Sequence, residues 1–388
     1  MAKLLPSKKS VLPPSIAKLR MEAPTIFWKG PIEQGVTQSI VGDYVTCGER
    51  CRIKKVLGLD KPEEFNKNLD YGNMWHTCEE YYYKKLDWKE ALKKVTTTYC
   101  RDYPSQQEDI YKWYRACELQ YEVYLKYWKK HEHEKTRKNI FTEKEFEVEY
   151  RPKGYTGEPF LLRGKWDGLD LIKNLNKLGI FFQENKTKSE IDDVQLTRSL
   201  KFDLQTMFYL VALYTSRNKI EELKKHKDIP IAGVRYNVIR RPLSGGKGSI
   251  TRHKATKNKP EETLESYFGR LKEVFEENAS TFFARYTVLV QPWEIKQFQE
   301  EFLDPVLLNL KDDYEWWKFC FNKDEEVYNY QLRQEQFPTH YRRHFRLPYS
   351  IWNPIAEGYR ASVDDYLDSG STVGLRRRKR VFPELSKD

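Results

Sequence analysis

The sequence predicts an α/β fold in which a central mixed β-sheet is flanked by helices. Two apolar segments, residues 161–172 and 179–186, flank the turn-forming residues 174–177 and therefore favour a β-hairpin. Residues 71–134 show mostly helical periodicity. This combination predicts a helical insertion, at about residues 84–140, between the first helices and the hairpin.

The remaining elements complete a sheet with helices around it. Further strands are expected at residues 145–150, 231–240 and 282–290, and further helices at 202–214, 261–278 and 293–318. We divide the chain into an N-terminal arm (1–36), a core (37–290) and a C-terminal extension (291–388) that ends in a basic tail. The basic cluster in that tail, residues 376–380, either contacts a polyanion or is solvated.

The predicted hairpin brings charged residues together. If it is symmetric, Leu169 faces Phe182 and Asp167 faces Glu184, and Lys186 lies on the same face as Glu184. Two carboxylates this close are costly unless a cation bridges them, and an oxygen-rich site suits Mg²⁺ or Mn²⁺. A one-residue bulge would break this register, and a surface hairpin with an ordinary ion pair is the simpler alternative.

Two helical segments carry polar residues at a spacing of four. Gly72 and His76 share a face, so the imidazole can reach a metal; taken alone, the motif favours the alternative of a packed, hydrogen-bonded histidine. Gln205 and Tyr209 share a face of the next apolar helix. Their polar groups can contact a phosphate, a base or Lys186, or they can be satisfied within a buried helix.

Five short motifs occur in a fixed order along the chain. Thr37 or Ser39 can cap a helix that ends near Cys47, and GxxxH, GxxD, ExK and QxxxY follow. This order resembles the RecB-like branch of the PD-(D/E)XK nuclease superfamily, and within it the phage exonucleases related to CRISPR-adaptation nucleases. The resemblance covers about residues 37–214, and it implies a restriction-endonuclease-like core.

The resemblance also implies a role for each motif residue. Asp167, Glu184 and His76 would be metal ligands, with the carbonyl of Asn185 as a further ligand. Lys186 would orient or activate the attacking water. Gln205 and Tyr209, the residues of the last motif, would support Lys186 or the DNA backbone.

The cysteines depart from the pattern of several relatives. Those relatives hold an iron–sulfur cluster on one N-terminal and three C-terminal cysteines, whereas only Cys320 lies in the C-terminal part here. A complete cluster is not supported, and Cys47 and Cys51 are interpreted as structural thiols.

Charge and composition favour a nucleic-acid partner. The net charge is +11, and the aromatic content of 14% is interleaved with basic residues, which suits bases and phosphates. Residues 243–259 form a Gly-rich basic loop that either clamps DNA or is solvated. Its candidate DNA contacts are Lys247, Arg252, Lys254 and Lys257.

The sequence contains neither a membrane-spanning segment nor a signal peptide, which predicts a protein of the cytoplasm, a bacterial host's if the gene belongs to a phage. We expect a metal-dependent deoxyribonuclease, an exonuclease by resemblance, that acts on single- or double-stranded DNA ends alongside recombination or replication proteins. A restriction-like or structure-specific endonuclease and a DNA-binding protein with a vestigial site are the alternatives.

Overall fold

The computed structural model describes residues 26–60, 62–131, 137–174, 177–243, 250–257, 260–322 and 375–386. They form two compact units. The first is built from the described parts of residues 1–34, 40–63 and 309–388, and the second from those of 35–39 and 64–308. The predicted hairpin belongs to the second unit.

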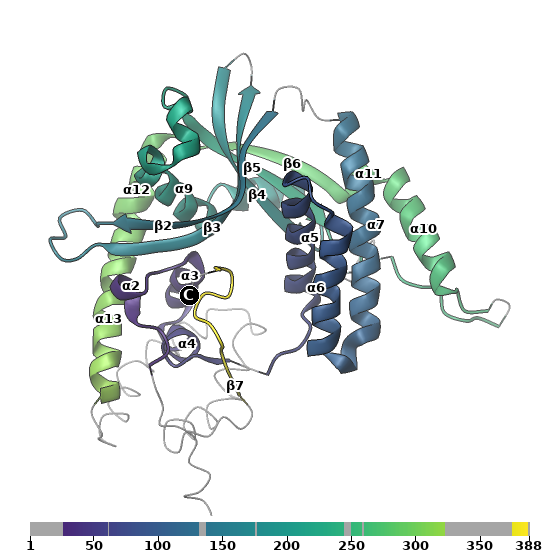
Figure 1. Ribbon diagram of the computed structural model, residues 1–388, viewed down its shortest axis with the longest axis horizontal. Helices are drawn as coiled ribbons and strands as arrows, with labels where there is room; N and C mark the ends of the chain where they lie inside the picture. Colours follow the sequence, from purple (N-terminus) through teal and green to yellow (C-terminus); the bar gives the residue numbers. More distant parts are fainter. Residues whose placement is uncertain are drawn as a thin grey trace, which may run out of the picture. The chain divides into compact units, whose positions relative to one another are not determined.

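The second unit is organised around a five-stranded sheet (Figure 1). The strand order follows the chain: β2 (Arg137–Tyr150), β3 (Phe160–Asn174), β4 (Lys177–Lys188), β5 (Ile231–Arg240) and β6 (Phe283–Leu289). Strands β4 and β5 are parallel and the other neighbours are antiparallel, so the predicted mixed sheet is confirmed.

Several helices of this unit begin at a residue whose side chain caps them. Asn66, Asp87 and Asp192 each accept hydrogen bonds from the first turn of the helix that follows. The helices are α5 (Lys67–Tyr83), α6 (Trp88–Asp102), η2 (Pro104–Gln106), α7 (Gln107–His131), α8 (Asp193–Leu200), α9 (Leu204–Ser216), η4 (Arg217–Lys219), η5 (Glu221–His226), α10 (Leu264–Glu277), α11 (Ala279–Phe282), α12 (Pro292–Phe298), η6 (Gln299–Leu303) and the start of α13 (Asp304–Asn322).

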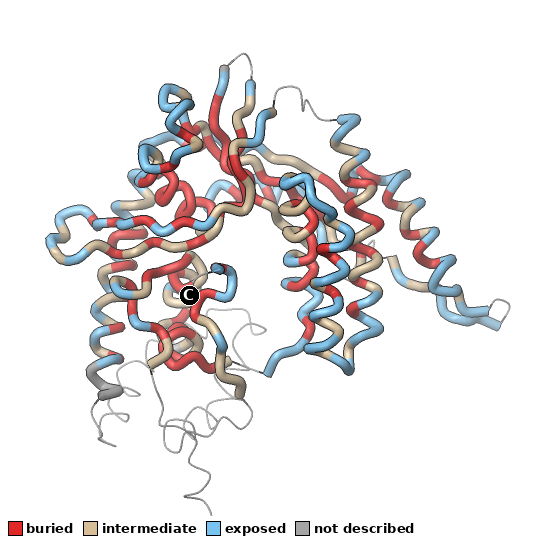
Figure 2. Tube along the Cα trace, viewed as in Figure 1, coloured by how far each residue is buried: buried red, intermediate tan, exposed pale blue. Residues whose placement is uncertain are grey.

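Helices cover both faces of the sheet, as two neighbouring residues of β5 show. The hydroxyl of Tyr236 donates to the Leu200 carbonyl at 2.7 Å, on the side of α8 and α9. The Asn237 amide donates to the Tyr124 hydroxyl of α7 at 2.8 Å. Successive side chains of a strand point to opposite faces. The central strands are therefore buried on both sides, as the red segments of Figure 2 show.

Strand β2 starts earlier than expected. Helix α7 ends at His131 and β2 begins at Arg137, so the helical insertion expected at about 84–140 runs four residues into the strand. Strand β2 is at the edge of the sheet, where polar side chains such as Lys138 and Glu145 are tolerated and hide the apolar alternation.

The first unit contains short elements and the remainder of α13. These are α2 (Gly30–Glu33), residues 40–46 of α3 (Gln38–Thr46), α4 (Gly48–Cys51), the π-helix η1 (Arg52–Val56), β1 (Leu59–Asp60) and β7 (Arg376–Arg377). Strands β1 and β7 pair, and Arg376 forms ion pairs with Asp60 at 3.9 Å and with Glu63. This part of the basic tail is therefore packed and not simply solvated. Cys47 and Cys51 are buried thiols that form no disulfide with another described residue.

No helix in the described part of the chain combines the length and the apolar character needed to cross a membrane.

Candidate active site

The candidate site lies where strands β3 and β4 separate. Leu171 pairs with Ile180 and Leu169 with Phe182, which is the predicted register. The ladder ends at Gly168 and Gln183, one pair before Asp167 and Glu184. Beyond it, Oδ2 of Asp167 accepts a hydrogen bond from the backbone N–H of Asn185 at 2.8 Å. The β3–β4 ladder therefore ends just before the two carboxylates, while Glu184 stays paired with Tyr236 of β5.

On the α9 side, three groups surround the ammonium of Lys186. Oε1 of Glu184 lies 2.8 Å from Nζ, and Oδ1 of Asp203 lies 3.6 Å from it. Lys186 also donates a hydrogen bond to Oε1 of Gln205 at 2.9 Å. Asp203 caps α9 as well, because the same oxygen accepts from the backbone of Thr206. The position of Lys186 is therefore fixed by both β4 and the start of α9.

On the α5 side, His76, Glu143 and Asp167 gather into a candidate metal site. Nδ1 of His76 lies 3.5 Å from Oε1 of Glu143 and 3.6 Å from Oδ2 of Asp167. One ligand atom from each of the three lies within 4.8 Å of the others. An imidazole and two carboxylates at this spacing suit a small divalent cation. The residues present therefore fit Mg²⁺ or Mn²⁺.

Glu143 is a residue that the sequence analysis missed. Its neighbours Thr142 and Lys144 pair with Gly168 and Trp166, which places Glu143 opposite Asp167 across the β2–β3 pair. Its backbone has φ 49°, a left-handed conformation that is unfavourable for a glutamate and that often marks functional sites. No local motif indicates a role for Glu143, because it lies in a run of charged residues typical of an edge strand.

The electrostatics favour a cation at this place. Burial raises the pKa of Glu184 to about 8, with Lys186 opposing the shift and Asp167 adding to it. Burial likewise raises the pKa of Asp167, which His76 lowers and Glu143 raises further. Oε2 of Glu184 is buried and has no hydrogen-bond partner among the described residues. A bound cation would relieve these costs.

Metal affinity should therefore rise with pH. Burial alone would lower the pKa of His76, but Asp167 and Glu143 raise it to about 10, so the metal-free imidazole is protonated at neutral pH. Binding must displace that proton, and its loss alone should increase the affinity up to about tenfold per pH unit until the pH approaches 10. Calorimetry of Mn²⁺ binding in buffers of different ionisation enthalpy would count the released protons. His76→Gln should release fewer; an unchanged count would exclude His76 as the proton source.

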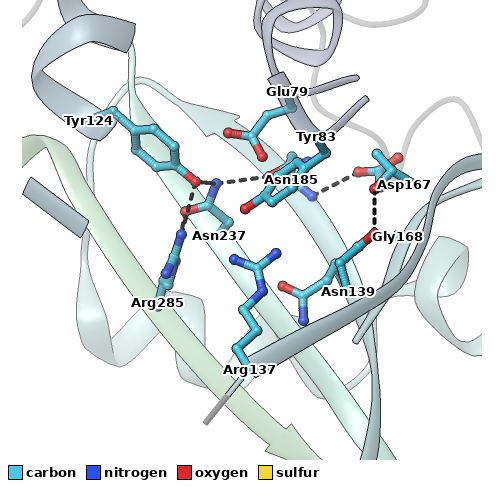
Figure 3. Close-up of a pocket in the computed structure, with 12 residues that line it drawn as sticks. Glu79, Tyr83, Tyr124, Arg137, Asn139, Asp167, Gly168, Asn185, Asn237 and Arg285 are labelled. Carbon is cyan, nitrogen blue, oxygen red and sulfur yellow. Dashed lines mark hydrogen bonds between the residues drawn. The ribbon is translucent and has the colours of Figure 1, made fainter. Parts of the chain in front are cut away.

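A polar network behind Asp167 holds Asn185 in place (Figure 3). Asn237 donates from Nδ2 to Oδ1 of Asn185 and to the Tyr124 hydroxyl, both at 2.8 Å. Arg285 donates to the same hydroxyl at 3.0 Å, and its guanidinium lies 4.0 Å from the ring centre of Trp128. The network links β4 to β5, β6 and α7. It holds in place the Asn185 backbone N–H that binds Asp167, and no motif in the sequence indicates this network.

Gly164 of the GxxD motif and Tyr209 of the QxxxY motif lie close together in the core. A Cβ at Gly164 would lie 2.6 Å from the ring of Phe146 and 2.9 Å from that of Tyr209. The Tyr209 ring also packs edge-on against Phe182. These contacts press α9 against the sheet, so the structure gives Tyr209 a packing role; its predicted support of Lys186 or DNA stays a prediction.

The basic loop is described only in part. Lys254 and Lys257 are exposed, and Arg252 is half-buried with Nη1 3.3 Å from Glu261. Lys247 lies outside the described residues. Binding of DNA by this loop stays a prediction.

An α/β core in which carboxylates and a buried lysine of the sheet and a histidine of a helix surround a candidate cation site has the architecture of a metal-dependent nuclease. A model of the PD-(D/E)XK nuclease superfamily matches residues 36–288, so the chain belongs to that superfamily. The match supports a nuclease that uses divalent metal ions. No curated protein matches the chain.

Proposed function

We propose that the protein is a Mg²⁺- or Mn²⁺-dependent DNA exonuclease that acts in phage DNA recombination, replication or repair. The observation that carries the nuclease assignment is the arrangement of Asp167, Glu184 and Lys186 at the end of the β3–β4 ladder. The exonuclease activity and the phage context draw on the resemblance of the ordered motifs to the RecB-like branch. We propose residues 37–290 as the nuclease core, with the N-terminal arm and the C-terminal extension outside it.

The residues of the site have distinct roles in this proposal. His76, Glu143 and Asp167 would hold the ion, with Glu184 and the Asn185 carbonyl as further ligands. The ion, when bound, lowers the pKa of a water molecule and polarises a phosphoryl oxygen.

Lys186 acts from the α9 side of the sheet. Its ammonium orients the attacking water and offsets the negative charge that develops on the scissile phosphate. Gln205 and Asp203 hold that ammonium in place, and burial makes its charge more effective because little water screens it. The substrate is DNA, and the excess of basic residues supports binding of its phosphates.

End-labelled linear DNA and closed circular DNA test the proposal directly. Wild type should degrade linear DNA with Mg²⁺ or Mn²⁺ but not with EDTA, and Glu184→Ala/Lys186→Ala should not degrade it. Cutting of circles would show an endonuclease on the same site. DNA binding without cleavage under all these conditions would favour a binding protein with a vestigial site.

A further inference from the structure

One large apolar side chain lies exposed beside the candidate site. Phe202 occupies the turn between α8 and α9, and it is 81% exposed, more than any other large hydrophobic residue among those described. A single exposed apolar residue is ordinary on a protein surface, so its exposure alone says nothing about function. Its position is informative, because the residues that follow it in the chain contact Lys186.

The backbone of Phe202 is tied to the residues that hold Lys186. The next residue, Asp203, lies 3.6 Å from the Lys186 ammonium. The same ammonium donates a hydrogen bond to Gln205 at 2.9 Å. The Phe202 N–H donates to the Ser199 carbonyl at 3.3 Å. The aromatic ring therefore projects from a hydrogen-bonded turn whose neighbours contact the catalytic lysine.

Several cations lie on the surface around this turn. Lys188 follows Lys186 on the same face of β4 and is half-buried. Arg198 and Lys201, both exposed, lie within four residues of Phe202, and Lys201 also lies 3.3 Å from Oε1 of Glu294. Cations on a surface suit the phosphates of a nucleic-acid strand, and an exposed aromatic ring among them suits a base. An apolar protein partner would instead meet these charges and have to desolvate them.

We propose that Phe202 stacks on the base of a nucleotide next to the scissile phosphate, while Lys188 binds the backbone of the same strand. This inference rests on the proposed nuclease function. It also specifies the substrate class. A base that stacks on Phe202 is no longer stacked on the neighbouring base of a duplex. The strand in the site is therefore single-stranded, or the frayed end of a duplex.

Cleavage of a single-stranded oligonucleotide with an abasic nucleotide, moved one position at a time past the scissile phosphate, tests the stacking contact. Phe202→Ala should lower kcat/KM about tenfold on intact DNA, the usual range for removing one stacked base. One abasic position should lower the wild-type value similarly, and combining the two changes should cause no further loss. Phe202→Trp should restore cleavage. The matched control is Leu178→Ala, an exposed apolar residue at the other end of β4, which should cleave like wild type.

A binding measurement separates this inference from the proposed function. In the Lys186→Ala background, 2-aminopurine at the sensitive position should be quenched on binding, and Phe202→Ala should remove the quenching. If wild type cleaves DNA but neither Phe202→Ala nor any abasic position matters, the stacking inference is wrong and the nuclease assignment stands. If wild type cleaves nothing, the nuclease assignment fails, and Phe202-dependent quenching alone decides whether the ring binds a base.

Discussion

Lys186→Ala is expected to lower the rate of DNA cleavage at least about 100-fold, the usual effect of removing one preorganised group that stabilises transition-state charge. Lys186 is the one cation that contacts Glu184 among the ion pairs of the described residues. Its side chain is only 16% exposed, so water cannot replace the lost charge well. Single-turnover cleavage at saturating enzyme would measure the chemical step without the contribution of binding.

The fold should survive this change. Without the ammonium, the pKa of Glu184, already raised to about 8 by burial, rises further, so the carboxyl group is neutral at pH 7. No unpaired charge is then left buried, and the thermal unfolding midpoint should stay near the wild-type value. Lys84→Ala is a suitable control because Lys84 is a surface residue at the end of α5, where it pairs with Glu80 of the same helix. Cleavage by Lys186→Ala at the wild-type rate would remove Lys186 from the mechanism.

The hairpin could be predicted because the residues that define it lie close together in the sequence. A turn-rich segment between two apolar strands sets which residues face each other, and one buried face penalises any slip of the register. The pairs Leu171–Ile180 and Leu169–Phe182 were predictable for this reason. The predicted contact between Lys186 and Gln205 follows from the order of motifs, since the helix after the ExK strand packs on the same face.

The missed residues come from distant parts of the chain. Tyr124, Asn237 and Arg285 belong to α7, β5 and β6, and only the strand order brings them behind Asn185. Arg376 pairs with Asp60 across more than 300 residues. Such contacts depend on the tertiary arrangement, and a single sequence carries no periodic signal for them.

Glu143→Gln is the second change with a large expected effect, and it tests a residue that only the structure reveals. The Glu143 side chain is 1% exposed, and its Oε2 lies 2.6 Å from Nζ of Lys165. The glutamine keeps the volume but removes the charge, so the affinity for Mn²⁺ should fall about 10- to 100-fold, as for other groups that hold or orient metal ligands. Calorimetric titration would measure it, and Glu149→Gln, an exposed position on the same strand, is the control.

Two opposing effects operate in this variant. Removing the Glu143 carboxylate lowers the pKa of His76, which eases loss of the imidazole proton and favours metal binding. It also removes an oxygen ligand and leaves the Lys165 ammonium without its carboxylate partner, which repels a cation. If affinity rises instead of falling, Glu143 acts only through His76 and is not a ligand.

The backbone at Glu143 offers a way to separate function from stability. A left-handed conformation costs an L-residue about 1 kcal/mol but costs glycine almost nothing. Glu143→Gly should therefore be at least as stable as Glu143→Gln in thermal unfolding, although both lose the carboxylate and should bind Mn²⁺ equally weakly. A glycine variant that is less stable than the glutamine variant would mean that side-chain packing, and not the need for a metal ligand, keeps a glutamate in this conformation. Weak binding by both with the expected order of stability would show that the strain at Glu143 is retained for the metal site.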